Sequence, residues 1–208
     1  MDNKRFIICF CKHPNPGKVK SRLAADLDPE RAAFIYQIIL ENTLQKLYTA
    51  NFEVALYCYP DVEHTFFTYC KDKHNVSLHK QRGDDLGMRM YNAIDDCLSN
   101  QRQLVLIGSD CLELDASYIN AAFLALDSGN DLVLGPTRDG GYALIGANKI
   151  DPSIFEDMAW STPQVLQATI ARIDNLSWKH TDLPLVRDVD TLSDYEYFSE
   201  HEEFKHLF

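Results

Sequence analysis

The most restrictive feature of this sequence is a short, fully apolar segment that ends beside a carboxylate. Residues Leu104–Gly108 (LVLIG) are typical of a β-strand that is buried on both faces, and Ser109 and Asp110 follow directly. Asp110 is then either an ordinary turn or helix-cap residue, or the side chain that holds something cationic at the carboxyl end of the strand.

Similar apolar segments alternate with helical patterns along the chain. Strands are expected at residues 6–11, 52–59, 76–79, 104–108, 131–135 and 142–146. Helices are expected at residues 29–47, 62–72, 86–98, 116–126 and 161–173, with a last one opening at a Ser193/Glu196 capping box. This alternation predicts an α/β fold with a mostly parallel sheet flanked by helices, and the 208 residues fit a single domain, 1–208.

Composition excludes several classes of protein. A net charge of -11 argues against a nucleic-acid partner, because few cations are available to replace the counterions of a phosphate backbone. No apolar run is long enough for a membrane span, and the apolar stretch near the N-terminus is too short for a signal peptide. The six cysteines lack metal-ligand spacing, so a reduced, cytoplasmic protein is expected.

Asp110 lies where ligands of open α/β sheets gather, outside the carboxyl ends of the strands. A carboxylate there suits Mg²⁺ or Mn²⁺, hard cations that one or two carboxylates and the substrate's phosphates bind together. Such a cation would allow an acidic protein to bind a diphosphate.

The loop after the first strand, KHPNPGKVKSRL, combines glycine with positive charge. Pro16 and Gly17 constrain it, and Lys20 and Arg22 could neutralise a pyrophosphate. The alternative is a solvated basic loop, since neither the P-loop signature nor that of dinucleotide-binding proteins is present.

Two further segments border the expected site. In GPTRDGGYALIG, the pair Gly140-Gly141 indicates either a tight hairpin or a sugar or acceptor lying against the backbone, and Asp139 is a candidate acid, base or hydroxyl acceptor. In RDVDTLSDYEYF, Asp188 and Asp190 point the same way if the backbone is extended, and either could be a second metal ligand. The alternative is that Asp190 or Thr191 caps the helix that follows. Lesser candidates are Gln81 and Gly83 for the nucleobase and Trp160 for the acceptor pocket. A segment such as Gln81–Met90 is more often just a turn, and Trp160–Thr162 also caps a helix.

Taken together, K-x-P-x-P-G-x-V-K-S-R-L, G-S-D-C-x-E-L-D, G-P-T-R-D-G-G-Y-A-L-I-G, W-S-T-x-x-V and D-V-D-T resemble a bacterial family of small GT-A-type transferases. That family is known as rSAM/selenodomain-associated transferase 1, or as arsenosugar-biosynthesis-type glycosyltransferases. The resemblance covers nearly the whole chain. It implies the nucleotide-diphospho-sugar transferase fold, with a mixed sheet.

The resemblance also implies roles for individual residues. The loop around Gly17, Lys20 and Arg22 would hold the nucleotide diphosphate, and Asp110 with Asp188 or Asp190 would bind the metal. The segment from Asp139 to Tyr142 would meet the transferred group or the acceptor.

Three functions are compatible with these residues. The first is a metal-dependent glycosyltransferase that moves a sugar from a nucleotide-diphosphate sugar to a small acceptor. The second is a guanylyl- or cytidylyl-type nucleotidyltransferase, which joins a nucleoside triphosphate to a phosphorylated small molecule. The third is a non-catalytic nucleotide-binding protein. The first loop is shorter and poorer in glycine than in related nucleotidyltransferases, which favours the first function.

Overall fold

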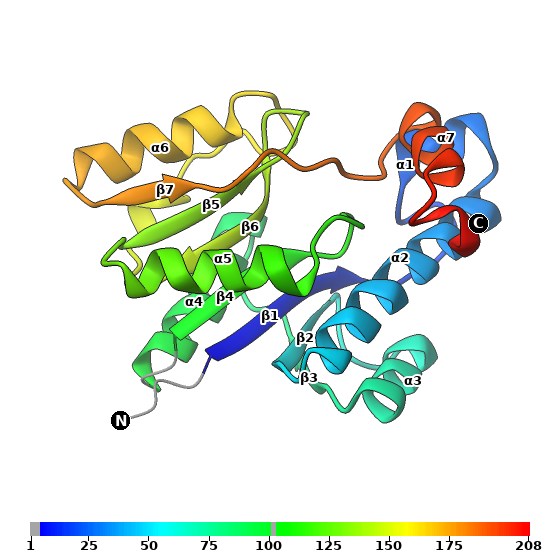
Figure 1. Cartoon of the computed structure of the whole chain (residues 1–208), viewed down its shortest axis with the longest axis horizontal. Helices are drawn as coiled ribbons and strands as arrows, with labels where there is room; N and C mark the ends of the chain where they lie inside the picture. The colour runs from blue at the N-terminus through cyan, green and yellow to red at the C-terminus, as the bar shows by residue number, and fades with distance from the viewer. Residues whose placement is uncertain (1–4, 101–102) are drawn as a thin grey trace.

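The computed structural model describes residues 5–100 and 103–208. Within these residues one seven-stranded sheet runs in the order β3-β2-β1-β4-β6-β5-β7, with helices packed on both of its faces (Figure 1). The strands are β1 (Arg5–Lys12), β2 (Glu53–Tyr59), β3 (Ser77–Lys80), β4 (Gln103–Gly108), β5 (Leu132–Pro136), β6 (Tyr142–Ala147) and β7 (His180–Asp182). The helices are α1 (Ser21–Asp26), α2 (Pro29–Thr49), α3 (Thr65–His74), α4 (Leu86–Ser99), α5 (Ala116–Asp127), α6 (Val165–Asn175) and α7 (Leu192–Glu200), with 3₁₀ turns η1 (Pro152–Ile154) and η2 (Lys205–Leu207).

The sheet is mostly parallel, as the alternation of strands and helices predicts. β1 lies between β2 and β4, parallel to both, and Ile8 is level with Ala55 on one side and Leu106 on the other. β6 is antiparallel to β4 and β5. The carboxyl ends of β1 and β4 therefore lie side by side, and the loops that follow them start at the same edge of the sheet.

Alternate side chains of each central strand enter two separate cores. In β1, Ile7 and Cys9 pack with helices α2, α3 and α5, whereas Ile8 and Phe10 pack on the opposite face with α4 and with the region of α6. This period of two explains why the strands are apolar at successive positions.

A third core joins segments that are far apart in the sequence. Helices α1 and α7 lie side by side (Figure 1). Leu23 of α1 packs with Ile35 of α2, with Phe198 of α7 and with Val189, which precedes α7. The segment between β7 and α7 crosses from one side of the molecule to the other to reach this core (Figure 1). That crossing carries residues 183–190 past the carboxyl end of β4.

Some local details differ from the sequence-based expectations. The capping box of the last helix is formed by Thr191 and Asp194, two residues before the expected Ser193/Glu196 pair. Helix α6 begins at Val165 because the backbone at Ser161 is left-handed, with φ 62°, and forms a turn. Strand β7 was not expected, since its three residues, His-Thr-Asp, have no apolar pattern.

None of the helices in residues 5–100 and 103–208 combines the length and the apolar character needed to cross a bilayer. All six cysteines are buried, and none forms a disulfide within this part of the chain.

Candidate functional site

A cavity of about 500 Å³ opens at the carboxyl ends of β1 and β4. Its floor is apolar and is formed by Phe10 of β1, Leu106 of β4, Ile145 of β6 and Met90 of α4. Charged residues line the cavity from the end of β1, the first loop, the start of α1, the end of β4, the β5–β6 turn and the segment before α7. The charged residues are Lys12, Lys18, Lys20, Arg22, Asp110, Asp139, Asp188 and Asp190. A cavity of this size, with an apolar floor and charged groups on one wall, suits a small ligand that has an apolar and an anionic part.

The end of β4 is held by a buried hydroxyl pair. Tyr36 of α2 lies with its hydroxyl 2.9 Å from Ser109 Oγ, and the same hydroxyl accepts a hydrogen bond of 2.9 Å from the backbone N–H of Lys12. The ends of β1 and β4 are thus tied to one helix, and Asp110 follows at a defined place. Tyr36 was not expected at the site because it lies among apolar residues of a helix and carries no local signal.

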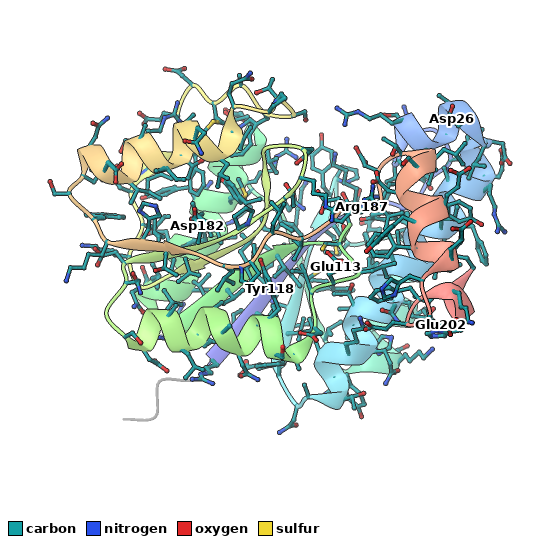
Figure 2. All side chains as sticks on the ribbon, turned by 45° about the horizontal axis from the view of Figure 1, so that its top comes forward. Asp26, Glu113, Tyr118, Asp182, Arg187 and Glu202 are labelled. Atoms are coloured by element: carbon teal, nitrogen blue, oxygen red, sulfur yellow. The ribbon has the colours of Figure 1, made fainter. Side chains whose placement is uncertain are left out.

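Backbone hydrogen bonds bring the second acidic segment to Asp110. The N–H of Val189 donates to the carbonyl oxygen of Asp110 at 2.9 Å, so the acids at 188 and 190 flank the end of β4. Further along, the N–H of Arg187 donates to Glu113 Oε2 at 2.7 Å, and these two residues meet near the middle of the molecule (Figure 2). Tyr118 of α5 also donates its hydroxyl to the carbonyl oxygen of Pro184, at 2.7 Å.

Lys20 and Arg22 pair with these acids. Lys20 Nζ lies 3.0 Å from Asp110 Oδ1 and 3.8 Å from Asp190 Oδ1, and Arg22 Nη1 lies 3.2 Å from Asp190 Oδ2. The side chain of Lys20 is only 2 % exposed, whereas that of Arg22 is 57 % exposed. The first loop, the end of β4 and the segment before α7 therefore meet at one cluster of charges.

Asp188 carries the clearest electrostatic signal in this cluster. Burial, reinforced by the nearby negative charge of Asp110, raises the pKa of Asp188 to about 7, although Lys20 acts in the opposite direction. Its burial and the negative charge around it thus disfavour the ionised form of this carboxyl group.

The cluster has the ligand chemistry of a divalent-cation site, but its side chains are not arranged around one point. Its carboxylate oxygens are the hard ligands that Mg²⁺ and Mn²⁺ prefer. Asp110 Oδ1 and Lys20 Nζ are both buried, and neither has a hydrogen-bond partner in the part of the chain that the structure describes. In the described residues, no three acidic, histidine or cysteine side chains are gathered closely enough to hold a metal ion. The residues fit a cation in kind, and their carboxylates would have to come closer together to bind one.

The structure brings together eight of the residues that the sequence analysis singled out. Those lining the cavity are Lys20, Arg22, Gln81, Asp110, Asp139, Tyr142, Asp188 and Asp190. Gln81 uses its amide N–H groups on the carbonyl oxygens of Cys11 and Tyr57, at 3.1 and 2.8 Å. Its side chain therefore joins the ends of β1 and β2 at the cavity wall.

Six other candidates lie outside the cavity lining. These are Pro16, Gly17, Gly83, Gly140, Gly141 and Trp160. Gly140 has φ 88°, and a Cβ there would lie 2.3 Å from the carbonyl oxygen of Pro163. Gly83 has φ 138° and packs against the first turn of α4, where a Cβ would lie 2.8 Å from Arg89 N. Backbone packing accounts for both glycines, while their expected ligand contacts stay predictions.

Asp139 lines the cavity but is also part of the β5–β6 turn. Its Oδ1 accepts hydrogen bonds from Thr137 Oγ1 at 2.6 Å and from the N–H of Gly141 at 3.0 Å. One carboxylate oxygen therefore holds the turn in shape, and the charge of Asp139 still raises the pKa of Asp188, as a smaller contribution than burial.

Comparison with solved structures identifies the fold. A presumed nucleotide-diphospho-sugar transferase from Desulfovibrio desulfuricans G20 matches with a TM-score of 0.86 and 28% sequence identity, over 97% of this chain and 90% of that one. A cytidylyltransferase from Leptospira borgpetersenii matches with a TM-score of 0.58 and 17% identity, over 93% of this chain and 84% of that one. CMP:2-keto-3-deoxy-manno-octonic acid synthetase complexed with CTP matches with a TM-score of 0.54 and 13% identity, over 93% and 96%. The chain thus has the fold of the nucleotide-diphospho-sugar transferases.

Residues 43–162, more than half of the chain, match the family described as "Uncharacterized protein conserved in bacteria (DUF2064)". This protein belongs to that family. No curated protein has a significantly similar sequence. The three structural neighbours named above are described as a presumed nucleotide-diphospho-sugar transferase, a cytidylyltransferase and a synthetase complexed with CTP.

Proposed function

We propose that this protein is a metal-dependent glycosyltransferase that moves a sugar from a nucleotide-diphosphate sugar to a small acceptor. The observation that carries the proposal is the meeting of Lys20 and Arg22 with Asp110, Asp188 and Asp190 on one wall of the cavity. Paired cations and carboxylates at the carboxyl edge of a parallel sheet suit a metal-bridged diphosphate.

In this mechanism each charged group has a separate task. Lys20 and Arg22 bind oxygens of the donor's diphosphate and neutralise the charge that grows as it departs, with Arg22 able to hold two oxygens at once. Asp110, together with Asp188 or Asp190, would hold Mg²⁺ or Mn²⁺. When bound, that cation supplies Lewis-acid stabilisation of the departing diphosphate.

The transfer itself exchanges one carbon–oxygen bond for another. The acceptor's hydroxyl oxygen bonds to the anomeric carbon of the sugar, and the bond from that carbon to the diphosphate oxygen breaks. The hydroxyl proton passes to a base. Asp139 is our candidate for that base if the configuration at the anomeric carbon inverts, since it lines the cavity and keeps one carboxylate oxygen outside the turn's hydrogen bonds.

A second candidate is nucleotidyl transfer in the same cavity, in which a phosphate of the acceptor attacks the α-phosphate of a nucleoside triphosphate and pyrophosphate leaves. Two observations favour it. Cytidylyltransferases are among the structural neighbours, and the end of β4 offers a single carboxylate, in Ser109-Asp110-Cys111, instead of a D-x-D pair. Against it stands the short loop between β1 and α1, residues 13–20.

The products distinguish the two reactions. We would incubate the protein with MnCl₂ or MgCl₂ and, separately, panels of nucleotide sugars and nucleoside triphosphates, with alcohols and phosphate esters as acceptors. Release of a nucleoside diphosphate supports glycosyl transfer, and release of pyrophosphate supports the second candidate.

Asp110→Asn tests whether the site is catalytic. We expect product formation to fall at least about 100-fold, because a group that stabilises the departing charge is lost. Nucleotide binding that is indifferent both to metal and to Asp110→Asn would instead indicate a non-catalytic nucleotide-binding protein.

A further inference from the structure

Lys20 is the most unusual residue of the site. It immediately precedes α1 with a left-handed backbone, φ 50° and ψ 46°, which costs a residue other than glycine about 1 kcal/mol. Its side chain is nevertheless almost completely enclosed, at 2 % exposure. Lysine side chains are rarely buried unless their charge is matched. The burial therefore places this ammonium group at a defined location in the ligand-free protein.

That location is between two carboxylates from different segments. Lys20 Nζ is 3.0 Å from Asp110 Oδ1, at the end of β4, and 3.8 Å from Asp190 Oδ1, in the segment before α7. Lys20 Nζ and Asp110 Oδ1 are close enough for Coulombic attraction but lie outside hydrogen-bond geometry. Both atoms are buried, and neither has a hydrogen-bond partner among the described residues. Burial removes water from both groups, and no hydrogen bond offsets that cost. Either group would therefore be stabilised by a new partner that binds it better.

A divalent cation and this ammonium group would compete for the same carboxylate oxygens. Two positive centres a few ångströms apart repel each other strongly in an enclosed site. The carboxylates of the described residues are not gathered into a three-ligand metal site, which is expected while the ammonium separates them.

We propose that Lys20 is a built-in counter-cation that holds the acidic cluster in the metal-free protein and leaves it for the diphosphate when the cation binds. The proposal rests on the cation site of the proposed function. It predicts that the cation alone binds weakly. Binding of the diphosphate draws the ammonium away from Asp110, so the diphosphate and the cation each strengthen the binding of the other by the same factor.

Arg22 differs from Lys20 in this respect. Its side chain is 57 % exposed, and its ion pair within the described residues is with Asp190 Oδ2, at 3.2 Å, so it can turn to a ligand without uncovering Asp110. The proposed exchange, in which Lys20 leaves Asp110 for the diphosphate, therefore depends on the enclosed lysine, and a substitution of Lys20 tests it.

The experiment compares Lys20→Met, Lys20→Gly and Lys18→Met in the full chain. Methionine keeps the length of the side chain, glycine suits the left-handed backbone, and Lys18 is an exposed lysine of the same loop that also lines the cavity. Free Mn²⁺ is measured by electron paramagnetic resonance in nucleotide-free protein. Binding of methylenediphosphonate, a diphosphate that resists hydrolysis, is measured by calorimetry in EDTA.

We expect opposite effects on the two ligands. Both Lys20 variants bind Mn²⁺ about tenfold more tightly than the wild type and bind methylenediphosphonate about tenfold more weakly, because the competitor of one ligand is the partner of the other. Lys18→Met changes Mn²⁺ affinity less than about twofold, because an exposed charge is screened by solvent. A purely structural role for Lys20 would weaken both ligands together.

Several results would overturn the proposal, and they separate it from the proposed function. If Asp110→Asn abolishes Mn²⁺ binding while neither Lys20 variant binds Mn²⁺ more tightly, the exchange is wrong and the cation site remains. Equal tightening by Lys18→Met would reveal a general effect of charge and also reject the exchange. If Asp110→Asn leaves Mn²⁺ binding unchanged, the cation site itself is wrong, and the exchange fails with it.

Discussion

The carboxyl group of Asp188 makes the stability of the protein depend on pH. Its carboxyl group is buried beside Asp110, which raises its pKa to about 7 from an ordinary value near 3.8. Between these two values the folded protein keeps a proton that the unfolded chain releases. The contribution of Asp188 to stability is therefore fully present below about pH 4 and is lost as the pH rises to about 7.

We predict that Asp188→Asn removes this pH dependence. In EDTA, the stability of the wild type relative to the variant should fall by on the order of 2–4 kcal/mol between pH 4 and pH 8. Thermal and urea unfolding at several pH values measure the difference, in which the contributions of other groups cancel. MnCl₂ should raise the stability of the wild type at pH 8 and have little effect on the variant. Identical pH profiles for both proteins in EDTA would contradict the prediction.

Gly140 illustrates a residue whose role is set by its backbone surroundings. We predict that Gly140→Ala lowers the free energy of unfolding by at least about 2 kcal/mol, because a Cβ would combine an unfavourable positive φ with a clash. Gly129→Ala is the matched control: Gly129 has φ 90°, but among the described residues no atom beyond its chain neighbours lies within 4 Å of the new Cβ. We expect it to cost only about 1 kcal/mol. Equal losses in urea unfolding would show that the contact with Pro163 is unimportant.

At the scale of elements, helix α7 anchors the acidic segment that precedes it. Thr191 and Asp194 form its capping box, and Arg187 Nε donates to Asp194 Oδ1 at 2.9 Å. Burial opposes ionisation of Asp194, yet hydrogen bonds from Thr191 and the positive charge of Arg187 hold its pKa below the ordinary value. Asp194 thus binds the residues on both sides of the segment that contains Asp188 and Asp190, namely Arg187 and Thr191.

We predict that Thr191→Ala lowers stability by about 1 kcal/mol and also weakens Mn²⁺-dependent nucleotide binding, because the segment 187–190 loses its anchor. Ser193→Ala, an exposed residue in the same turn, should leave both properties within experimental error. Chemical unfolding and calorimetric titration provide the two readouts. A larger effect of Ser193→Ala would place the helix cap where the sequence pattern alone suggested it.

At the scale of the whole molecule, the cavity depends on a core that is remote from the sheet. Phe198 of α7 is fully buried with Leu23 of α1, Ile35 of α2 and Val189, which lies between the two acids of the site. This core determines where the end of the chain docks, and so whether its carboxylates reach β4.

We predict that Phe198→Ala lowers stability by about 3–5 kcal/mol and weakens Mn²⁺ binding, since a cavity next to Val189 loosens the docked segment. Phe34→Ala, at a position that is 52 % exposed, should cost less than about 1 kcal/mol and leave Mn²⁺ binding unchanged. Unfolding curves and Mn²⁺ titrations compare them. Unchanged Mn²⁺ affinity in a folded Phe198→Ala protein would separate the core from the site.

Local patterns were sufficient for most of the fold. The apolar run at 104–108 and the helices expected from residues 29 and 116 correspond to β4, α2 and α5, because strand periodicity and helix starts depend on neighbouring residues. In the structure, Asp28 and Asp115 cap these two helices. The pattern failed where the element was short and polar, as in β7, or where two capping boxes compete within a few residues, as at Thr191 and Ser193.

The sequence by itself determined the alternation of strands and helices and the presence of a carboxylate at the end of an apolar strand, since both are recorded in adjacent residues. Only the tertiary structure decided that Asp188 and Asp190 flank Asp110, through the hydrogen bond from Val189 N to the Asp110 carbonyl oxygen, and that Lys20 lies enclosed against Asp110. The physical reason is that contacts between remote segments depend on how the whole chain packs, and no local spacing of residues encodes that path.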